Sequence, residues 1–279
     1  MSCKLICIDM DGTLLNDEKT INEENLVAIK KAHDKGVRIA VCTGRLFTSA
    51  KYFGDVIGVK APIIASNGAY IREKDEERII YKLELGVKNL IKIQDIVGKY
   101  KLRVYYNTAD SVIAANGFPK NYAYAKMNEK LKEDFKIGLI DSKDIYKTIE
   151  EKGSEILKCI CISEDGLDTY KAKKELLDLN EFEVVSSGED NIEIMHKGNS
   201  KGRAVKELAE IFGISREEVM CIGDNENDLS MIEYAGIGVA MGNGSELVKK
   251  AADYITDTNN NSGVARAIEK FVLSTGNEI

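Results

Sequence analysis

Residues 7–15, CIDMDGTLL, join an apolar run to two closely spaced carboxylates. The apolar residues 5–8 predict a short buried strand. Asp9 and Asp11 stand where this strand ends, and Asp17 follows soon after. Because unpaired charges are costly to bury, carboxylates at the end of a core strand need a partner, and their position points to a site at that end of the strand.

Short apolar strands and helices alternate on either side of this stretch. Residues 22–35 predict a helix with Asn22 in position to cap it, and residues 46–56 predict a second helix. Between and after them, residues 37–42 and 62–66 predict strands. This βαβαβ order is typical of a parallel sheet covered by helices.

The pattern changes between about residues 72 and 190, where Lys, Glu, Tyr and Asn become more frequent. Strands are predicted there at 104–107, 111–115, 158–163 and 182–187, and helices at 87–99 and 165–178. The first pattern then returns, with helices predicted at 200–212, 226–235, 245–252 and 262–273 and strands at 219–224 and 237–241. We therefore predict an α/β protein: a Rossmann-like parallel-sheet core of residues 1–82 and 191–279, interrupted by an inserted α+β domain at 83–190.

Composition excludes several classes of function. The 279 residues carry a formal net charge of −7, whereas a nucleic-acid-binding surface normally needs a basic face. No apolar run reaches the 18 residues of a transmembrane helix, and the N-terminus lacks the features of a signal peptide, so we expect a cytoplasmic protein without a membrane partner. The six cysteines form no CxxC pair and are expected to be buried free thiols.

Polar residues follow four of the predicted core strands. Beside the acids of the first strand, they are Thr43-Gly44-Arg45, Ser66-Asn67-Gly68 and the run from Gly223 to Asp228. Ligands of open α/β sheets bind outside the carboxyl ends of the strands, so these groups are expected to share one site. Converging acids there favour Mg²⁺, which prefers carboxylate, carbonyl and water oxygens. Lys201, at the start of a predicted helix, can complete the neutralisation of a bound phosphate.

The motifs DMDGTLL, TGR, SNGA, SKG and GDNENDLSM resemble, in order and spacing, those of the haloacid dehalogenase-like phosphatases. The long insertion between SNGA and SKG is similar to the large α/β cap of the Cof-type subfamily, and within it the chain most resembles the YidA-like sugar phosphatases. The likeness is dense over residues 1–80 and 191–275 and thin across the insertion. It implies a parallel-sheet core with an inserted cap that shapes the pocket of the leaving group.

The resemblance also implies a role for each motif residue. Asp9 would attack phosphorus and Asp11 would act as general acid and base. Mg²⁺ would be bound by the carboxylates of Asp9 and Asp224 and by the backbone carbonyl of Asp11. Asp228 and Asn67 would support the site from behind. The groups expected to hold the substrate are Met10, Thr43, Gly44, Arg45, Lys201 and Asn227, with the role of Arg45 open between a substrate contact and a pair with an acid.

We therefore expect a Mg²⁺-dependent phosphatase of small phosphorylated metabolites, with sugar phosphates as the leading class and an aspartyl-phosphate on Asp9 as intermediate. The alternatives are a phosphomutase of the same superfamily and, less well supported, a phospho-aspartate signalling receiver. We expect a monomer or a small homo-oligomer. Four tyrosines of the insertion could line a substrate pocket or pack in the core or on the surface. We assign all four to packing: Tyr105, Tyr106, Tyr122 and Tyr124.

Overall fold

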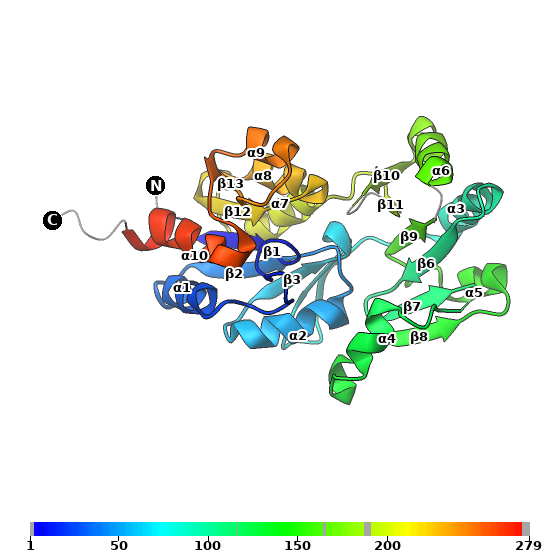
Figure 1. The fold of residues 1–279 in the computed structure, drawn as a ribbon, viewed down its shortest axis with the longest axis horizontal. Helices are drawn as coiled ribbons and strands as arrows, with labels where there is room; N and C mark the ends of the chain where they lie inside the picture. Colours follow the sequence, from blue (N-terminus) through cyan, green and yellow to red (C-terminus); the bar gives the residue numbers. More distant parts are fainter. Residues whose placement is uncertain (1–2, 116, 164–165, 187–190, 275–279) are drawn as a thin grey trace.

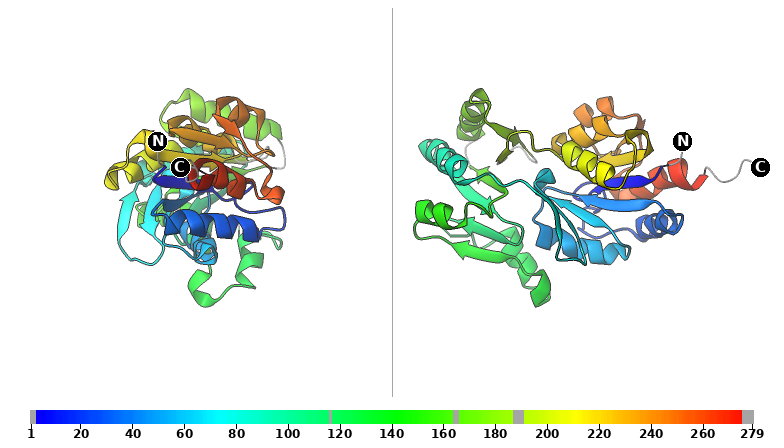
Figure 2. Two further views of the ribbon diagram at one scale, coloured as in Figure 1. Left: turned by 90° about the vertical axis from the view of Figure 1, so that its left-hand side faces the viewer. Right: turned by 180° about the vertical axis from the view of Figure 1, so that it is seen from behind.

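The computed structural model describes residues 3–115, 117–163, 166–186 and 191–274 and contains two sheets in two lobes. The first lobe, the core, holds both ends of the chain, and the second, the cap, is formed by the middle of the sequence (Figures 1 and 2). The α/β class and the inserted α+β domain are confirmed. The longest helices of the described chain have 13 residues, and none of the described helices qualifies as a membrane-spanning segment.

The core sheet has the strand order β14-β13-β12-β1-β2-β3-β4-β5, and its pairs are parallel from β14 to β3. The strands are β1 Leu5–Asp9, β2 Arg38–Cys42, β3 Pro62–Ala65, β4 Tyr70–Glu73, β5 Ile79–Lys82, β12 Val219–Gly223, β13 Ile237–Ala240 and β14 Tyr254–Ile255. The helices are α1 Glu23–Asp34, α2 Phe47–Ile57, α7 Lys201–Ile211, α8 Leu229–Tyr234, α9 Glu246–Ala251 and α10 Gly263–Ile268.

Strand β1 lies in the middle of the core sheet and is buried on both faces. Ile6 and Ile8 pack with α1, α2 and α10, whereas Leu5 and Cys7 pack with α7 and α8 on the opposite face. Successive side chains of a strand point to opposite faces, so a strand covered by helices on both sides must be apolar throughout. This explains the unbroken apolar run that precedes Asp9.

The cap is built on a second sheet of order β10-β11-β9-β6-β7-β8, in which only β7 and β8 pair in parallel. Its strands are β6 Arg103–Asn107, β7 Ser111–Ala114, β8 Gly138–Asp141, β9 Lys158–Ile162, β10 Phe182–Val185 and β11 Asn191–His196. Its helices are α3 Val87–Lys99, α4 Ala123–Asn128, α5 Ile145–Lys152 and α6 Gly166–Asp178. Residues of α3, α5 and α6 cover one face of this sheet, and the other face turns towards the core.

Several sequence predictions need correction. Strand β11 begins at residue 191, where the core was expected to resume, but it pairs with β9 and β10, so the chain returns to the core only after His196. The antiparallel strands β4 and β5 were not predicted, and they extend the core sheet as far as Lys82. Residues 226–235 form a 3₁₀ turn, Glu226–Asp228, before α8 rather than one helix. Residues 262–273 form α10 and then a π-helical turn, Glu269–Leu273, rather than one helix.

The cap of helix α1 also differs from the prediction. Asn22 occupies the N-cap position without a side-chain capping bond. Its amide instead donates to the carbonyl oxygens of Asn259 and Asn260, because the loop before α10 folds against the start of α1. All six cysteines are free and buried, as expected.

A buried ion pair joins the cap to the core. Alternation along β9 and β11 places Cys159, Cys161, Ile192 and Ile194 among the cap helices, so Lys158 and Glu193 point the other way. Their Nζ and Oε2 atoms are 2.7 Å apart, and the side chains are 1% and 4% exposed. Lys158 Nζ also donates to the carbonyl oxygen of Gly44 at 2.6 Å, and Asn67 Nδ2 donates to Glu193 Oε2 at 2.6 Å. Both partners beyond the pair belong to the core.

We expect Glu193→Gln to destabilise the protein strongly, because it leaves the buried Lys158 ammonium without a carboxylate. Breaking a buried pair by removing one partner costs about 3–5 kcal/mol. Glu181→Gln is the matched control, because it removes the partner of Lys92 in a cap pair whose side chains are 44% and 35% exposed. Exposed pairs contribute about 0.2–1 kcal/mol. Urea unfolding of both variants measures the difference, and equal losses would contradict a stabilising role for the buried pair.

Candidate functional site

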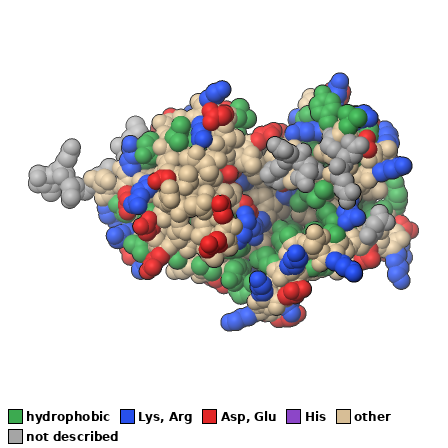
Figure 3. Space-filling view, viewed as in Figure 1, with side chains coloured by type: hydrophobic (Ala, Val, Ile, Leu, Met, Phe, Trp, Pro, Cys, Tyr) green, Lys and Arg blue, Asp and Glu red, His purple; other side chains and the backbone are tan. Residues whose placement is uncertain are grey.

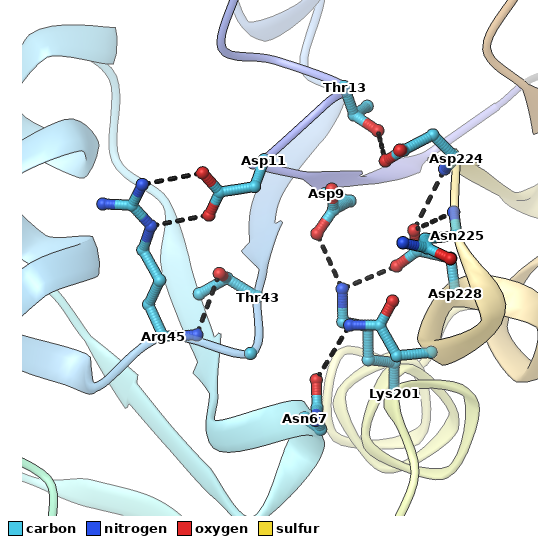
Figure 4. Close-up of polar contacts among 12 residues, drawn as sticks. Asp9, Asp11, Thr13, Thr43, Arg45, Asn67, Lys201, Asp224, Asn225 and Asp228 are labelled. Atoms are coloured by element: carbon cyan, nitrogen blue, oxygen red, sulfur yellow. Dashed lines mark hydrogen bonds and ion pairs between the residues drawn. The ribbon is translucent and has the colours of Figure 1, made fainter. Parts of the chain in front are cut away.

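The adjacent strands β12, β1, β2 and β3 run in parallel, so their carboxyl ends open on one edge of the core sheet. Asp9 ends β1, Thr43 follows β2, Ser66 follows β3 and Asp224 follows β12. The convergence that was predicted from the sequence is therefore present. Figure 4 shows these strand ends and the polar contacts among their side chains.

Lys201 is the central cation of the site. Ser200 caps α7 by accepting a hydrogen bond from the amide of Arg203, so Lys201 is the first helical residue. Its Nζ lies 2.6 Å from Asp9 Oδ1 and 2.6 Å from Asp228 Oδ1, and its side chain is fully buried (Figure 4). Burial alone would lower the pKa of Lys201, but the carboxylates of Asp228 and Asp9 outweigh it and raise that pKa well above its usual value. The lysine is therefore held as a cation.

Asp228 supports the site rather than facing a ligand. One oxygen accepts from Lys201, and Oδ2 accepts from the backbone amides of Asp224 and Asn225 at 3.0 and 3.1 Å. This carboxylate fixes the turn after β12 and so sets the direction of the Asp224 side chain. Its supporting position agrees with the prediction from the sequence.

Asp9, Asp224 and Asp228 bring three carboxylates together. One oxygen from each lies within 4.8 Å of the others. Burial, and then the nearby Asp228, raise the pKa of Asp224 to about 6 and that of Asp9 well above its usual value. Thr13 Oγ1 donates to Asp224 Oδ1 at 2.9 Å and partly offsets the rise at Asp224. Three acids around one lysine leave an excess of negative charge.

The donor set fits Mg²⁺. Carboxylate oxygens are preferred Mg²⁺ ligands, and a divalent cation would remove the excess negative charge. Because Asp228 already uses both oxygens, the carboxylates of Asp9 and Asp224 are better placed to bind a metal ion. Gly12 adjoins this pair with φ +81°, and a Cβ atom there would lie 2.4 Å from Asp224 Oδ2. Glycine is therefore required here both for its backbone conformation and for the space that Asp224 occupies.

Asp11 faces a different partner from Asp9. Arg45 donates to it through Nε at 2.6 Å and Nη2 at 2.7 Å (Figure 4). Lys19 Nζ lies 3.3 Å from Asp11 Oδ1. Burial opposes ionisation of Asp11, but the hydrogen bonds and charge of Arg45, helped by Lys19, outweigh burial and lower its pKa. Of the two roles left open for Arg45, the structure shows the pair with an acid.

The groups expected to hold phosphate lie around these acids. Thr43 is buried and its Oγ1 accepts from the amide of Arg45 at 3.1 Å. Asn227 Nδ2 donates to Asn67 Oδ1 at 3.1 Å, and Asn67, in the left-handed region at φ 54°, also contacts Glu193. Asn67 thus holds the Asn227 side chain through this hydrogen bond. The side chain of Met10 is fully buried in the core, so only its backbone can reach the site.

A cavity of about 310 Å³ opens between these core groups and the cap. Its lining contains several residues that the sequence did not assign to the site: Tyr124, Lys158, Ile160, Glu193 and Asn225. Lys158 and Glu193 are charged residues within otherwise apolar runs, and this pattern could have marked them as candidate site residues. Tyr105 and Tyr122 pack with Phe118, and Tyr106 is buried in the cap, as expected. Tyr124 packs against Tyr122 and also lines the cavity.

Known proteins share this arrangement. The family of haloacid dehalogenase-like hydrolases matches residues 6–268. The 5-amino-6-(5-phospho-D-ribitylamino)uracil phosphatase YcsE of Bacillus subtilis is 36% identical over 97% of this chain and 96% of its own. The structure of a haloacid dehalogenase-like hydrolase from B. subtilis superposes with a TM-score of 0.85 and 27% identity. This match covers 96% of this chain and 100% of the B. subtilis chain. The structure of the subclass IIB sugar phosphatase BT4131 superposes with a TM-score of 0.77 and 27% identity. This match covers 96% of this chain and 98% of the BT4131 chain.

These matches confirm the resemblance that the motifs predicted. The matched family spans nearly the whole chain, and the relatives named here are covered almost completely by it. The parallel-sheet core and the inserted cap are thus parts of one known architecture. The chain belongs to the haloacid dehalogenase-like hydrolases and is a phosphatase of their Cof type.

Proposed function

We propose that this phosphatase hydrolyses small phosphate monoesters of sugars or polyols, with Mg²⁺, through an aspartyl-phosphate on Asp9. The observation that carries the proposal is the pairing of Asp9 with Lys201 beside Asp224, with Asp11 held apart by Arg45. The two acids of one motif have different surroundings, which suits a nucleophile and a proton carrier. Names of relatives that specify a ribityl phosphate and a sugar phosphatase support this leaving group.

Asp9 is the residue that attacks phosphorus in this mechanism. Lys201 holds the Asp9 carboxylate and adds positive charge next to the incoming phosphoryl oxygens. Mg²⁺, bound by the carboxylates of Asp9 and Asp224 and the backbone carbonyl of Asp11, would supply charge neutralisation for the phosphate. Thr43, the backbone amides of Met10 and Gly44, and Asn227 would hold the remaining oxygens. Positioning and charge neutralisation supply most of the catalysis in phosphoryl transfer.

Asp11 carries the proton. In the described state Arg45 keeps it ionised, whereas a general acid must hold a proton when the ester oxygen departs. A phosphate dianion in the cavity competes for Arg45, which lines that cavity, and its charge favours protonation of Asp11. Asp11 would then protonate the leaving alcohol and, in the second step, take a proton from the water that attacks the aspartyl-phosphate.

Phosphoryl transfer to water is favoured over the alternatives. A phosphomutase would share Asp9 and Asp11 but return the phosphoryl group to a sugar, and the relatives named above are phosphatases. A signalling receiver does not fit a chain whose family is that of the haloacid dehalogenase-like hydrolases. Assays of phosphate release with and without a sugar bisphosphate activator test the phosphomutase directly.

Metal dependence should follow the titration of Asp224. EDTA should abolish activity, and Mg²⁺ should restore it where Ca²⁺ does not, because Ca²⁺ prefers larger and looser coordination. Mg²⁺ must displace a proton from Asp224, whose pKa is raised to about 6, first by burial and then by Asp228. Apparent Mg²⁺ affinity should therefore weaken as the pH falls through this value. Activation by Mg²⁺ measured between about pH 5 and pH 8 tests this.

Thr13→Val provides the control for this pH dependence. The Thr13 hydroxyl stabilises the Asp224 carboxylate, so its removal should raise the Asp224 pKa further and move the loss of Mg²⁺ affinity to higher pH. Activity that persists in excess chelator would contradict the metal assignment. A Mg²⁺ affinity that does not change across this range would contradict the role of Asp224.

Asp9→Asn and Asp11→Asn should separate the two acids. Asp9→Asn removes the nucleophile and should abolish turnover of every ester. Asp11→Asn should stop hydrolysis of sugar phosphates, whose alkoxides need a proton to leave, but nitrophenyl phosphate should still phosphorylate Asp9. Water attack without a base should then be slower by about 10²–10⁴-fold. Rapid-quench kinetics of Asp11→Asn with labelled nitrophenyl phosphate should show a burst of nitrophenolate near one equivalent per site. The labelled phosphate should stay on the protein and map to Asp9. Steady turnover without a burst, or label on another residue, would refute this division.

A further inference from the structure

The buried ion pair between the cap and the core reaches the phosphate site through a short series of hydrogen bonds. Hydrophobic side chains gather where the two lobes meet (Figure 3). Lys158 and Glu193 are buried at this junction, with side chains 1% and 4% exposed, and both line the cavity that contains Asp9. The proposed mechanism gives neither residue a task, although both are charged side chains beside the reacting groups.

Glu193 fixes the direction of the Asn67 side chain. Asn67 Nδ2 donates to Glu193 Oε2 at 2.6 Å, and the same oxygen accepts from Lys158 Nζ at 2.7 Å. A carboxylate paired with an ammonium can only accept hydrogen bonds, so the NH₂ group of Asn67 must face Glu193 and its carbonyl oxygen must face away. The backbone of Asn67 is also held, because its amide donates to the carbonyl oxygen of Thr43 at 3.0 Å and its carbonyl accepts from Asn199 Nδ2 at 3.1 Å.

Asn67 in turn directs the side chain of Asn227. Asn67 Oδ1 accepts from Asn227 Nδ2 at 3.1 Å, and Asn227 lines the cavity. An NH₂ group has two hydrogens, so the bond to Asn67 leaves one of them for a phosphate oxygen. If Asn67 turned its side-chain amide over, its NH₂ group would meet that of Asn227, and two donors repel. Asn227 would then turn its oxygen towards Asn67, and this oxygen would replace the N–H that faces the phosphate.

We propose that Glu193, a residue of the cap, is a positioning residue for phosphate binding: it fixes the side chain of Asn67, which presents an N–H of Asn227 to the phosphate. The inference rests on the proposed function, in which Asn227 holds a phosphoryl oxygen. The cap then contributes to binding of the phosphate, which all substrates share, and not only to the choice of leaving group.

The paired variant Lys158→Met/Glu193→Leu removes the acceptor for Asn67 without leaving a buried charge alone. Replacing a buried ion pair by apolar side chains of similar volume is often neutral for stability. The inhibition constant of inorganic phosphate against nitrophenyl phosphate, at saturating Mg²⁺, should rise about 10-fold, because a hydrogen bond to a charged group is misdirected. In an Asn227→Ala background the same two substitutions should change this constant by no more than about 2-fold. An equal rise in both backgrounds, or no rise in either, would overturn the proposal.

Glu193→Gln separates the position of the acceptor from the stability of the fold. Lys158 Nζ lies beside the oxygen that Asn67 contacts, so a glutamine must turn its own oxygen to that side and should still accept from Asn67. We therefore expect a lower free energy of unfolding than in the parent but an unchanged inhibition constant for phosphate. If phosphate inhibition of Glu193→Gln and of the paired variant follows their stability instead, the pair is only structural and the proposal fails.

Lys92→Met/Glu181→Leu is the matched control, because it makes the same substitutions in a cap pair whose side chains are 35% and 44% exposed. It should leave phosphate inhibition unchanged, and a rise equal to that of the paired variant would contradict the proposal. Phosphate inhibition can be measured whichever residue attacks phosphorus. Turnover by Asp9→Asn would refute the proposed aspartyl-phosphate, but it would leave the effect of Glu193 on phosphate binding as a separate result.

Discussion

The contact of Lys201 with Asp9 and Asp228 is the interaction on which the site depends. It places a fully buried ammonium between two carboxylates, one from the end of β1 and one from the 3₁₀ turn after β12. A buried charge without a partner costs several kcal/mol, so these strand ends and the start of α7 must stay together. Asp228 also accepts hydrogen bonds from the backbone amides of residues 224 and 225, and these bonds set the position of Asp224. The same contact thus stabilises the fold and arranges the reacting groups.

The cap contributes to this arrangement with one face of its sheet. One face is covered by α3, α5 and α6, and the opposite face presents Lys158, Ile160 and Glu193 to the core. The ion pair on that face contacts the loop after β2, which is expected to hold phosphate, and the turn after β3, which is expected to support the site. Docking of the cap and the shape of the phosphate site are therefore coupled through Gly44 and Asn67.

The two acids of the first motif have opposite surroundings although one residue separates them. Asp9 is buried with Asp228 and Asp224 near it, and its pKa is raised, whereas the cations Arg45 and Lys19 lower the pKa of Asp11. The turn at Gly12 makes this possible, because its left-handed backbone redirects the chain immediately after Asp11. In the proposed mechanism the leaving group departs on the side of the site that contains Asp11 and Arg45, because Asp11 protonates it.

The sequence by itself determined the core and the strand ends at which polar groups converge. Buried parallel strands must be apolar throughout, and their carboxyl ends must share an edge, so polar residues after β1, β2, β3 and β12 predicted one site without knowledge of any contact. The amphipathic period of residues 87–99 likewise predicted α3 with its observed bounds. Only the tertiary structure decided which residues of the cap face the core. Lys158, Glu193 and Tyr124 meet the site through the packing of one domain on another, and no local pattern encodes that packing. The pairing of β11 with β9 was equally hidden, because the paired residues are more than 25 positions apart along the chain.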